Sequence, residues 1–74
     1  MEKFNHIISK IFEIPETDVK DTMSSKDIPK WDSMNYLLFI AELEKEYNMS
    51  FTMDEVMNAQ TVGDIRTIVA ARKK

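Results

Sequence analysis

The side chain with the clearest chemical use in this sequence is the hydroxyl of Ser33, which follows a long polar stretch and begins the most apolar helical segment. A phosphate joined to a hydroxyl at a helix start would face unpaired backbone N–H groups and the positive end of the helix dipole. That position stabilises an exposed anion by about 0.3–1 kcal/mol. Asp32 and Ser33 are both favoured N-cap residues, so helix capping is an alternative role that does not exclude modification.

Ser33 lacks the partners that would make it a nucleophile in its own right. The only histidine is His6, and nothing in the sequence sets an activating base beside Ser33. The sequence has no cysteine, which excludes thiolate catalysis, disulfides and Cys-ligated metal. Any thioester chemistry would therefore need a thiol from outside the polypeptide. We expect a substrate-carrying partner of enzymes rather than an enzyme, with no catalytic residue and no metal site.

Size and charge predict one small domain over residues 1–74. A net charge of −3 at pH 7 argues against nucleic acid as a ligand, because that affinity depends on neutralising phosphates. The first residues contain no apolar stretch of signal-peptide length, and no run approaches the roughly 20 apolar residues of a membrane span. We expect a soluble, cytoplasmic monomer that does not insert into membranes, and the lack of cysteine fits a reducing compartment.

Hydrophobic periodicity predicts a first helix at about residues 2–13, followed by a long connection. The helix ends before Pro15, which disfavours helical geometry at the residue that precedes it. Residues 15–32 are polar, and a connection this long is unusual in a small domain unless it packs down or has a function. The spaced apolar side chains expected to pin it to the bundle are Val19, Met23 and Ile28.

Residues 33–47 predict a second helix, whose first half is apolar over most of its circumference. One side forms a core stripe that includes Phe39 and Leu43. A domain of this size has too little chain to bury every side of such a helix. An adjacent side is therefore expected to be partly exposed and to bind partners, although it could also be core. The residues of this predicted docking surface are Met34, Leu37, Leu38, Ala41, Glu44 and Lys45.

Two capping-box patterns predict the remaining helices. Residues 52–55, Thr-Met-Asp-Glu, would start a short helix in which Val56 and Met57 point inward. Residues 61–64, Thr-Val-Gly-Asp, would start the last helix, which has its own apolar stripe. The pattern as a whole predicts three full helices and one short helix.

The stretch Asp32-Ser33-Met34 at the start of the most apolar helix resembles the acyl carrier protein family. Residues 51–57 and 61–65 resemble that family as well, so the likeness covers essentially the whole chain. The resemblance implies an all-α fold, an acyl-carrier-like four-helix bundle with a short third helix and a long loop between the first two helices.

The resemblance also implies a cofactor and partners. A phosphopantetheinyl transferase would attach 4′-phosphopantetheine from coenzyme A to Ser33, making the chain a phosphoprotein, and the thiol of that group would hold acyl groups as thioesters. Asp32 matches the acidic residue of the family motif and would serve transferase recognition by helping to position Mg²⁺, while Met34 matches its hydrophobic residue. The cargo would pass to acyl or ketoacyl synthases or acyltransferases of fatty-acid biosynthesis or related lipid metabolism.

Two departures from the family's usual pattern leave the pathway open. Residues 29–31, Pro-Lys-Trp, stand where the family often has glycine. Leu38, Ala41 and Lys45 also dilute the acidity of the second helix. A polyketide, peptidyl or other specialised carrier is therefore an alternative, as is an unmodified helical interaction module. Trp31 could shield the arm or anchor the loop, and the acyl chain could lie inside the bundle or in solvent.

Overall fold

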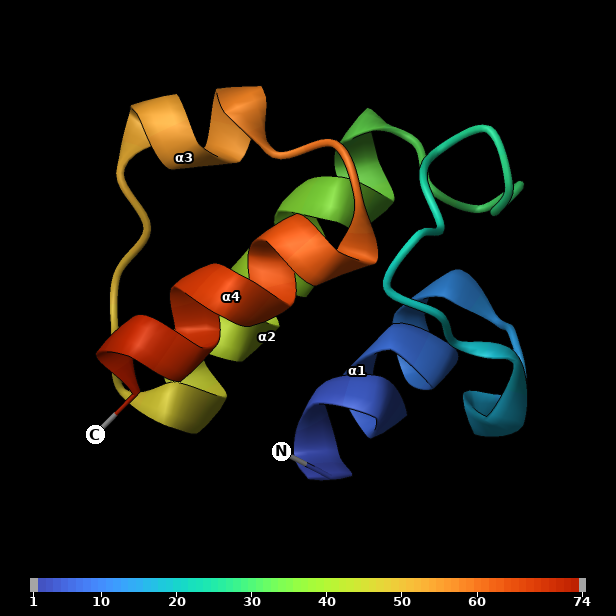
Figure 1. Ribbon diagram of the computed structural model, residues 1–74, viewed down its shortest axis with the longest axis horizontal. Helices are drawn as coiled ribbons and strands as arrows, with labels where there is room; N and C mark the ends of the chain where they lie inside the picture. The colour runs from blue at the N-terminus through green and yellow to red at the C-terminus, as the bar shows by residue number, and fades with distance from the viewer. Residues whose placement is uncertain (1, 74) are drawn as a thin grey trace.

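The computed structural model describes residues 2–73 and shows an all-α bundle of three longer helices and one short helix (Figure 1). The long connection between α1 and α2 loops out at one side of the bundle in that view. The predicted fold class, with its short third helix and long first loop, is confirmed. The elements are α1 (Glu2–Phe12), the 3₁₀ turn η1 (Glu16–Asp18), α2 (Ser33–Tyr47), α3 (Met53–Asn58) and α4 (Val62–Arg72).

The first two helices end where the backbone becomes left-handed. After α1, Glu13 adopts a φ of 56° and donates its N–H to Ser9 O at 3.0 Å. Pro15 then continues the chain in an extended conformation. After α2, Asn48 adopts a φ of 51° as the C-cap, a conformation that asparagine tolerates better than most residues. None of the helices in residues 2–73 combines the length and the apolarity that a membrane span requires.

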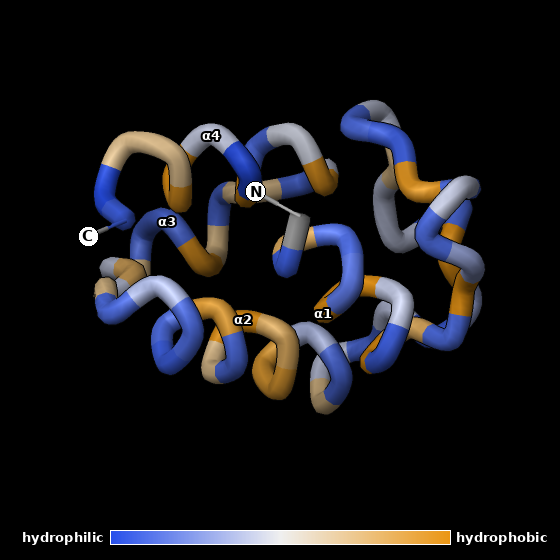
Figure 2. The backbone as a smooth tube through the Cα atoms, turned by 90° about the horizontal axis from the view of Figure 1, so that it is seen from below, coloured by the Kyte–Doolittle hydropathy of each residue, from blue (hydrophilic) through white to orange (hydrophobic). Residues whose placement is uncertain are grey.

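The core lies between α1, α2 and α4, and the long connection adds the buried side chain of Ile28. Phe39 of α2 contacts two rings of α1, with centroids 5.7 Å from Phe4 and 5.3 Å from Phe12. Such aromatic pairs contribute about 0.5–1.5 kcal/mol each beyond the burial of their area. Figure 2 shows hydrophobic residues on successive turns of α2, only some of which face this core.

The long connection is held against the start of α4. Val62 donates its N–H to Met23 O and Gly63 donates its N–H to Asp21 O, each at 2.9 Å. A Cβ on Gly63 would approach Asp21 to 3.0 Å, so this close contact favours glycine. Arg66 Nε also donates to Asp21 Oδ1 at 2.7 Å. The predicted anchoring of the connection is confirmed, with one buried and two partly buried apolar residues: Ile28, Val19 and Met23.

The short helix α3 confirms one prediction and corrects another. Its capping box is present, because Thr52 Oγ1 accepts the N–H of Glu55 and Glu55 Oε1 accepts the N–H of Thr52. Val56 packs against the core, but Met57 is 73% exposed, so its predicted inward orientation is wrong. Consecutive helical residues point about 100° apart. Only one side of this six-residue helix reaches the core, and Met53 and Met57 lie on another side.

Candidate functional site

Ser33 is the first residue of α2, and it is exposed. Asp32 is the N-cap: its Oδ1 accepts the N–H of Asn35 at 2.8 Å, and its carbonyl accepts the N–H of Tyr36 at 2.9 Å. The N–H groups of Ser33 and Met34 lie in the first turn, where no helical carbonyl precedes them. An anion on the Ser33 hydroxyl would therefore lie at the positive end of α2, beside donors that the cap does not use.

The segment before Ser33 is held by a hydrogen bond and by stacked rings. Asn35 Nδ2 donates to Lys30 O at 2.8 Å. The Trp31 ring stacks on Phe12, with centroids 5.3 Å apart and planes 8° apart. Trp31 also stacks on Tyr36, with centroids 5.7 Å apart and planes 20° apart. Of the two roles considered for Trp31, these contacts support anchoring of the loop.

Tyr36 links the start of α2 to the short helix α3. Its Oη donates a hydrogen bond to the Val56 carbonyl at 2.7 Å. Burial raises the pKa of Tyr36, and the negative charge of Asp64 adds to this effect. The Tyr36 hydroxyl therefore remains a neutral donor at physiological pH, and it keeps α3 beside the segment that carries Ser33.

An open hollow of about 370 Å³ lies beside Ser33. The rings of Trp31 and Tyr36 form its apolar part, and Ser25, Asp32 and Ser33 form its polar part. Sequence reasoning missed Ser25, because no local pattern connects this loop residue to the start of α2. The hollow places an aromatic surface and several hydroxyl or carboxylate groups around the candidate attachment point.

The apolar part of the predicted docking surface lies on the outside of α2. Met34 is 73% exposed, Leu37 is 59% exposed and Leu38 is 53% exposed. Ala41 and Lys45 are also exposed and continue this side toward the end of the helix. Side chains three or four residues apart are neighbours on a helix, so these residues form one surface that begins next to Ser33.

Glu44 differs from the other predicted docking residues. Its Oε2 accepts the N–H of Phe51 at 2.8 Å, so one carboxylate oxygen holds the connection between α2 and α3.

Sequence reasoning also missed two exposed apolar residues of α3, Met53 and Met57. Their spacing of four residues was the available signal, because it puts both side chains on one side of a helix.

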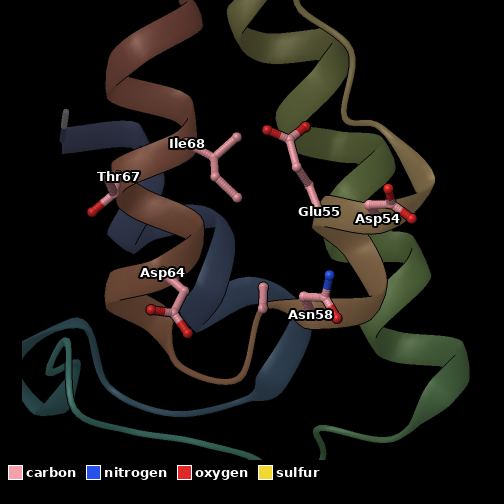
Figure 3. A pocket seen from close by; sticks show the side chains of 7 residues that line it. Asp54, Glu55, Asn58, Asp64, Thr67 and Ile68 are labelled. Carbon is pink, nitrogen blue, oxygen red and sulfur yellow. The ribbon is translucent and has the colours of Figure 1, made fainter.

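A second hollow, of about 460 Å³, lies between α3 and α4 (Figure 3). Figure 3 shows acidic side chains on both helices, with Asp54 and Glu55 on α3 and Asp64 on α4. The Glu55 carboxylate accepts the N–H of Thr52 and pairs with Arg72. The pKa of Glu55 is lowered, mainly by the hydrogen bond from Thr52 and then by that from Arg72. Glu55 is thus engaged in starting α3 and in joining it to α4.

Asp64 is engaged in the same way at the start of α4. Its Oδ2 accepts the N–H of Gln60 at 2.9 Å and the N–H of Thr61 at 3.2 Å. These two hydrogen bonds, Gln60 first, lower the pKa of Asp64. Residues 2–73 contain no group of three or more acidic, histidine or cysteine side chains placed to hold a metal ion. In the second hollow, Glu55 and Asp64 therefore accept hydrogen bonds at the starts of two helices. The hollow beside Ser33 has an exposed hydroxyl instead.

Comparisons with known proteins identify the family of the chain. Residues 3–69 match the family described as "Phosphopantetheine attachment site". Among solved structures, the fold matches that of a proposed acyl carrier protein from Mycobacterium tuberculosis with a TM-score of 0.85 and 28% sequence identity. That match covers 95% of this chain and 93% of the other. No curated protein matches the sequence.

Proposed function

This chain belongs to the phosphopantetheine attachment site family, and we propose that Ser33 is its attachment residue and that the chain is a discrete acyl carrier. Domains of this family hold 4′-phosphopantetheine covalently. One observation carries the assignment to Ser33: its hydroxyl is exposed at the start of α2, within the matched residues 3–69. When bound, the group supplies a thiol for acyl thioesters, which this cysteine-free chain lacks.

The residues around Ser33 fit a phosphodiester. Ser33 Oγ would bond to the phosphorus atom of the pantetheine phosphate while the bond from that phosphorus to the bridging oxygen of the coenzyme A pyrophosphate breaks. Adenosine 3′,5′-bisphosphate would leave, and the hydroxyl proton would pass to a base of the transferase or to water. The first-turn N–H groups of Ser33 and Met34 then face the phosphodiester anion. Asp32 caps the helix through Oδ1, and we propose that its second carboxylate oxygen helps to position the Mg²⁺ of a phosphopantetheinyl transferase.

We further propose that the exposed side of α2 is where the transferase and the acyl or ketoacyl synthases or acyltransferases dock. Met34, Leu37, Leu38 and Ala41 would supply apolar contacts, and Lys45 and the second oxygen of Glu44 would supply charge. The exposure of large apolar side chains next to Ser33 supports this proposal. A dimer that covered this side would block every partner, so we propose that the carrier acts as a monomer.

The cargo and cellular setting are proposed from the composition of the chain and from its departures from the family pattern. We place the carrier in fatty-acid or related acyl biosynthesis in the cytoplasm, where the absence of cysteine fits a reducing compartment. A polyketide, peptidyl or other specialised carrier is the alternative that Trp31 and the weaker acidity of the second helix favour. Residues 2–73 pack around one core, which supports a single carrier domain over residues 1–74.

Loading of the chain tests the assignment to Ser33. The protein is incubated with a phosphopantetheinyl transferase and coenzyme A, and its intact mass should rise by one phosphopantetheine group. Ser33→Ala should show no gain. Ser50→Ala, which removes an exposed hydroxyl near the other end of α2, should gain the same mass as the wild type. The proposal fails if the wild type stays at its unmodified mass with several transferases, or if Ser33→Ala is loaded.

The exposed apolar side of α2 also favours a second candidate function, a helical interaction module that is never modified. The two functions differ in which substitution matters. For a carrier, both Ser33→Ala and Leu38→Glu should prevent delivery of an acyl group to a partner enzyme. For an unmodified module, Leu38→Glu should abolish partner binding, whereas Ser33→Ala should have no effect in cells.

A further inference from the structure

Two hollows on the surface share three lining residues, and together they form a groove that begins at Ser33. The first is the hollow beside Ser33 described above. The other is a hollow of about 430 Å³ that extends to Gln60 and Thr61 in the connection between α3 and α4. Both hollows are lined by Ser25, Trp31 and Tyr36. We call the combined feature the arm groove; it leads from Ser33 across these three residues to Thr61.

Independent contacts hold the two sides of the arm groove. On the loop side, Ser24 pairs with Thr61 in an antiparallel bridge, and the Ser24 N–H donates to Asp27 Oδ2 at 3.0 Å. On the helix side, the Tyr36 hydroxyl donates a hydrogen bond to α3, and the Trp31 ring stacks on Phe12 and on Tyr36. The groove is therefore preorganised, because its lining side chains belong to segments that are fixed by other contacts.

The arm groove is lined mostly by uncharged side chains, with Lys26 and Asp32 as the charged ones, and it suits a chain that carries amides. The rings of Trp31 and Tyr36 offer aromatic surface for methyl groups. The hydroxyls of Ser25 and Thr61 and the side-chain amide of Gln60 offer donors and acceptors along the other side. Pantetheine has two amides, a hydroxyl and a dimethyl-substituted carbon in sequence, so it matches both kinds of surface.

We propose that the arm groove is the resting site of the pantetheine arm, an inference that rests on attachment at Ser33. Attachment at one end makes the contact intramolecular, with an effective concentration of roughly millimolar for a short linker, so weak contacts are enough to fill the groove. The arm then rests on the surface, outside the core. The groove does not include Met34, Leu37 or Leu38, so a partner can dock on α2 before the arm leaves its resting site.

Amide NMR spectra of the unmodified and the loaded protein test the resting site, after intact mass has verified loading. We expect loading to shift the amide signals of Ser25, Gln60 and Thr61 and the indole N–H of Trp31, in addition to those of residues 32–35. Nuclear Overhauser contacts should join the methyl groups of the arm to the Trp31 ring. Trp31 is the only tryptophan, so its fluorescence emission should change on loading as well.

A variant that fills the groove sharpens the test. In loaded Ser25→Phe, the loading shifts at Gln60 and Thr61 should be lost, because a ring would occupy the part that both hollows share. Lys20→Phe adds the same ring to an exposed position of the same connection outside the groove, and its loading shifts should match the wild type.

Each failure has its own signature. No gain of mass in the wild type overturns the attachment at Ser33 and this inference together. Loading that shifts only residues 32–35 overturns the resting site alone, because the arm is then in solvent. Loading shifts at Gln60 and Thr61 that persist in Ser25→Phe also overturn it, because they would not depend on the groove.

Discussion

The two acid-lined hollows of this bundle differ in whether their polar groups are already engaged. Between α3 and α4, Glu55 and Asp64 accept the N–H groups that begin two helices, and these hydrogen bonds lower the pKa of each carboxyl. Beside Ser33, Asp32 alone forms the cap, and the Ser33 hydroxyl stays exposed. The carboxylates between α3 and α4 therefore stabilise the starts of two helices. The exposed hydroxyl of Ser33 is instead suited to the phosphopantetheine attachment that defines the family.

This difference predicts opposite responses to substitution. Changes to the engaged carboxylates should lower stability and leave loading at Ser33 intact. Changes to the Ser33 hydroxyl should prevent loading and leave stability intact. The stability of the Ser33 side should come instead from the aromatic residues beneath it, because Trp31 and Tyr36 carry the packing contacts there.

Trp31→Ala is expected to have the largest effect on stability. Truncating a buried aromatic residue to alanine costs about 3–5 kcal/mol, and the partly buried Trp31 should lie at the lower end, about 3 kcal/mol. Urea unfolding measures the loss, and Trp31→Phe should retain most of the stability because it keeps a ring on Phe12. An unfolding free energy equal to that of the wild type would show that the stack does not anchor the loop.

Asp64→Ala should have a smaller effect, about 1 kcal/mol, because it removes the acceptor that begins α4. The matched control is Asp54→Ala, an exposed carboxylate that lines the same hollow. Its cost should stay within about 0.5 kcal/mol, as for most surface substitutions. Both variants should load like the wild type. If Asp64→Ala loses loading but not stability, the comparison between the two hollows is wrong.

Local patterns in the sequence were enough to predict the helices. Residues 33–47 combine a favoured cap with a run of helical apolar spacing, and α2 spans Ser33–Tyr47 in the structure. Both capping boxes were also predictable, because each depends on residues three apart. The expectation that Met57 points inward is wrong because α3 has fewer than two turns, too few for the spacing of apolar residues to define its inner side.

Contacts between distant segments were not predictable in the same way. The bridge between Ser24 and Thr61 and the groove from Ser33 to Thr61 depend on how the long connection packs against α4. No periodicity in either segment encodes that pairing. The sequence leaves two roles open for Trp31, because its role depends on the positions of Phe12 and Tyr36, which only the packed bundle defines.

The dependence of stability on pH should come from the two hydrogen-bonded carboxylates between α3 and α4. The folded-state pKa values of Asp64 and Glu55 are depressed. Their contribution is therefore present above the unfolded pKa values, about 3.9 and 4.3. It is lost as pH falls through the folded values, since protonation removes the acceptors. Urea unfolding should show constant stability near about pH 6 and a decline below about pH 4. Asp64→Asn should make that decline shallower, and an unchanged decline would show that other carboxyls cause it.

Ser33→Ala is expected to have the smallest effect on stability and the largest effect on loading. Asp32 Oδ1 makes the cap, so Asp32→Ala should cost about 1 kcal/mol. Ser33→Ala should change the unfolding free energy by less than about 0.5 kcal/mol while abolishing the mass gain on loading. Urea unfolding of the two variants shows whether the Ser33 hydroxyl caps the helix or is available for modification. If Ser33→Ala is as destabilised as Asp32→Ala, the hydroxyl is engaged in the fold like the carboxylates of Glu55 and Asp64, and the contrast between the two hollows disappears.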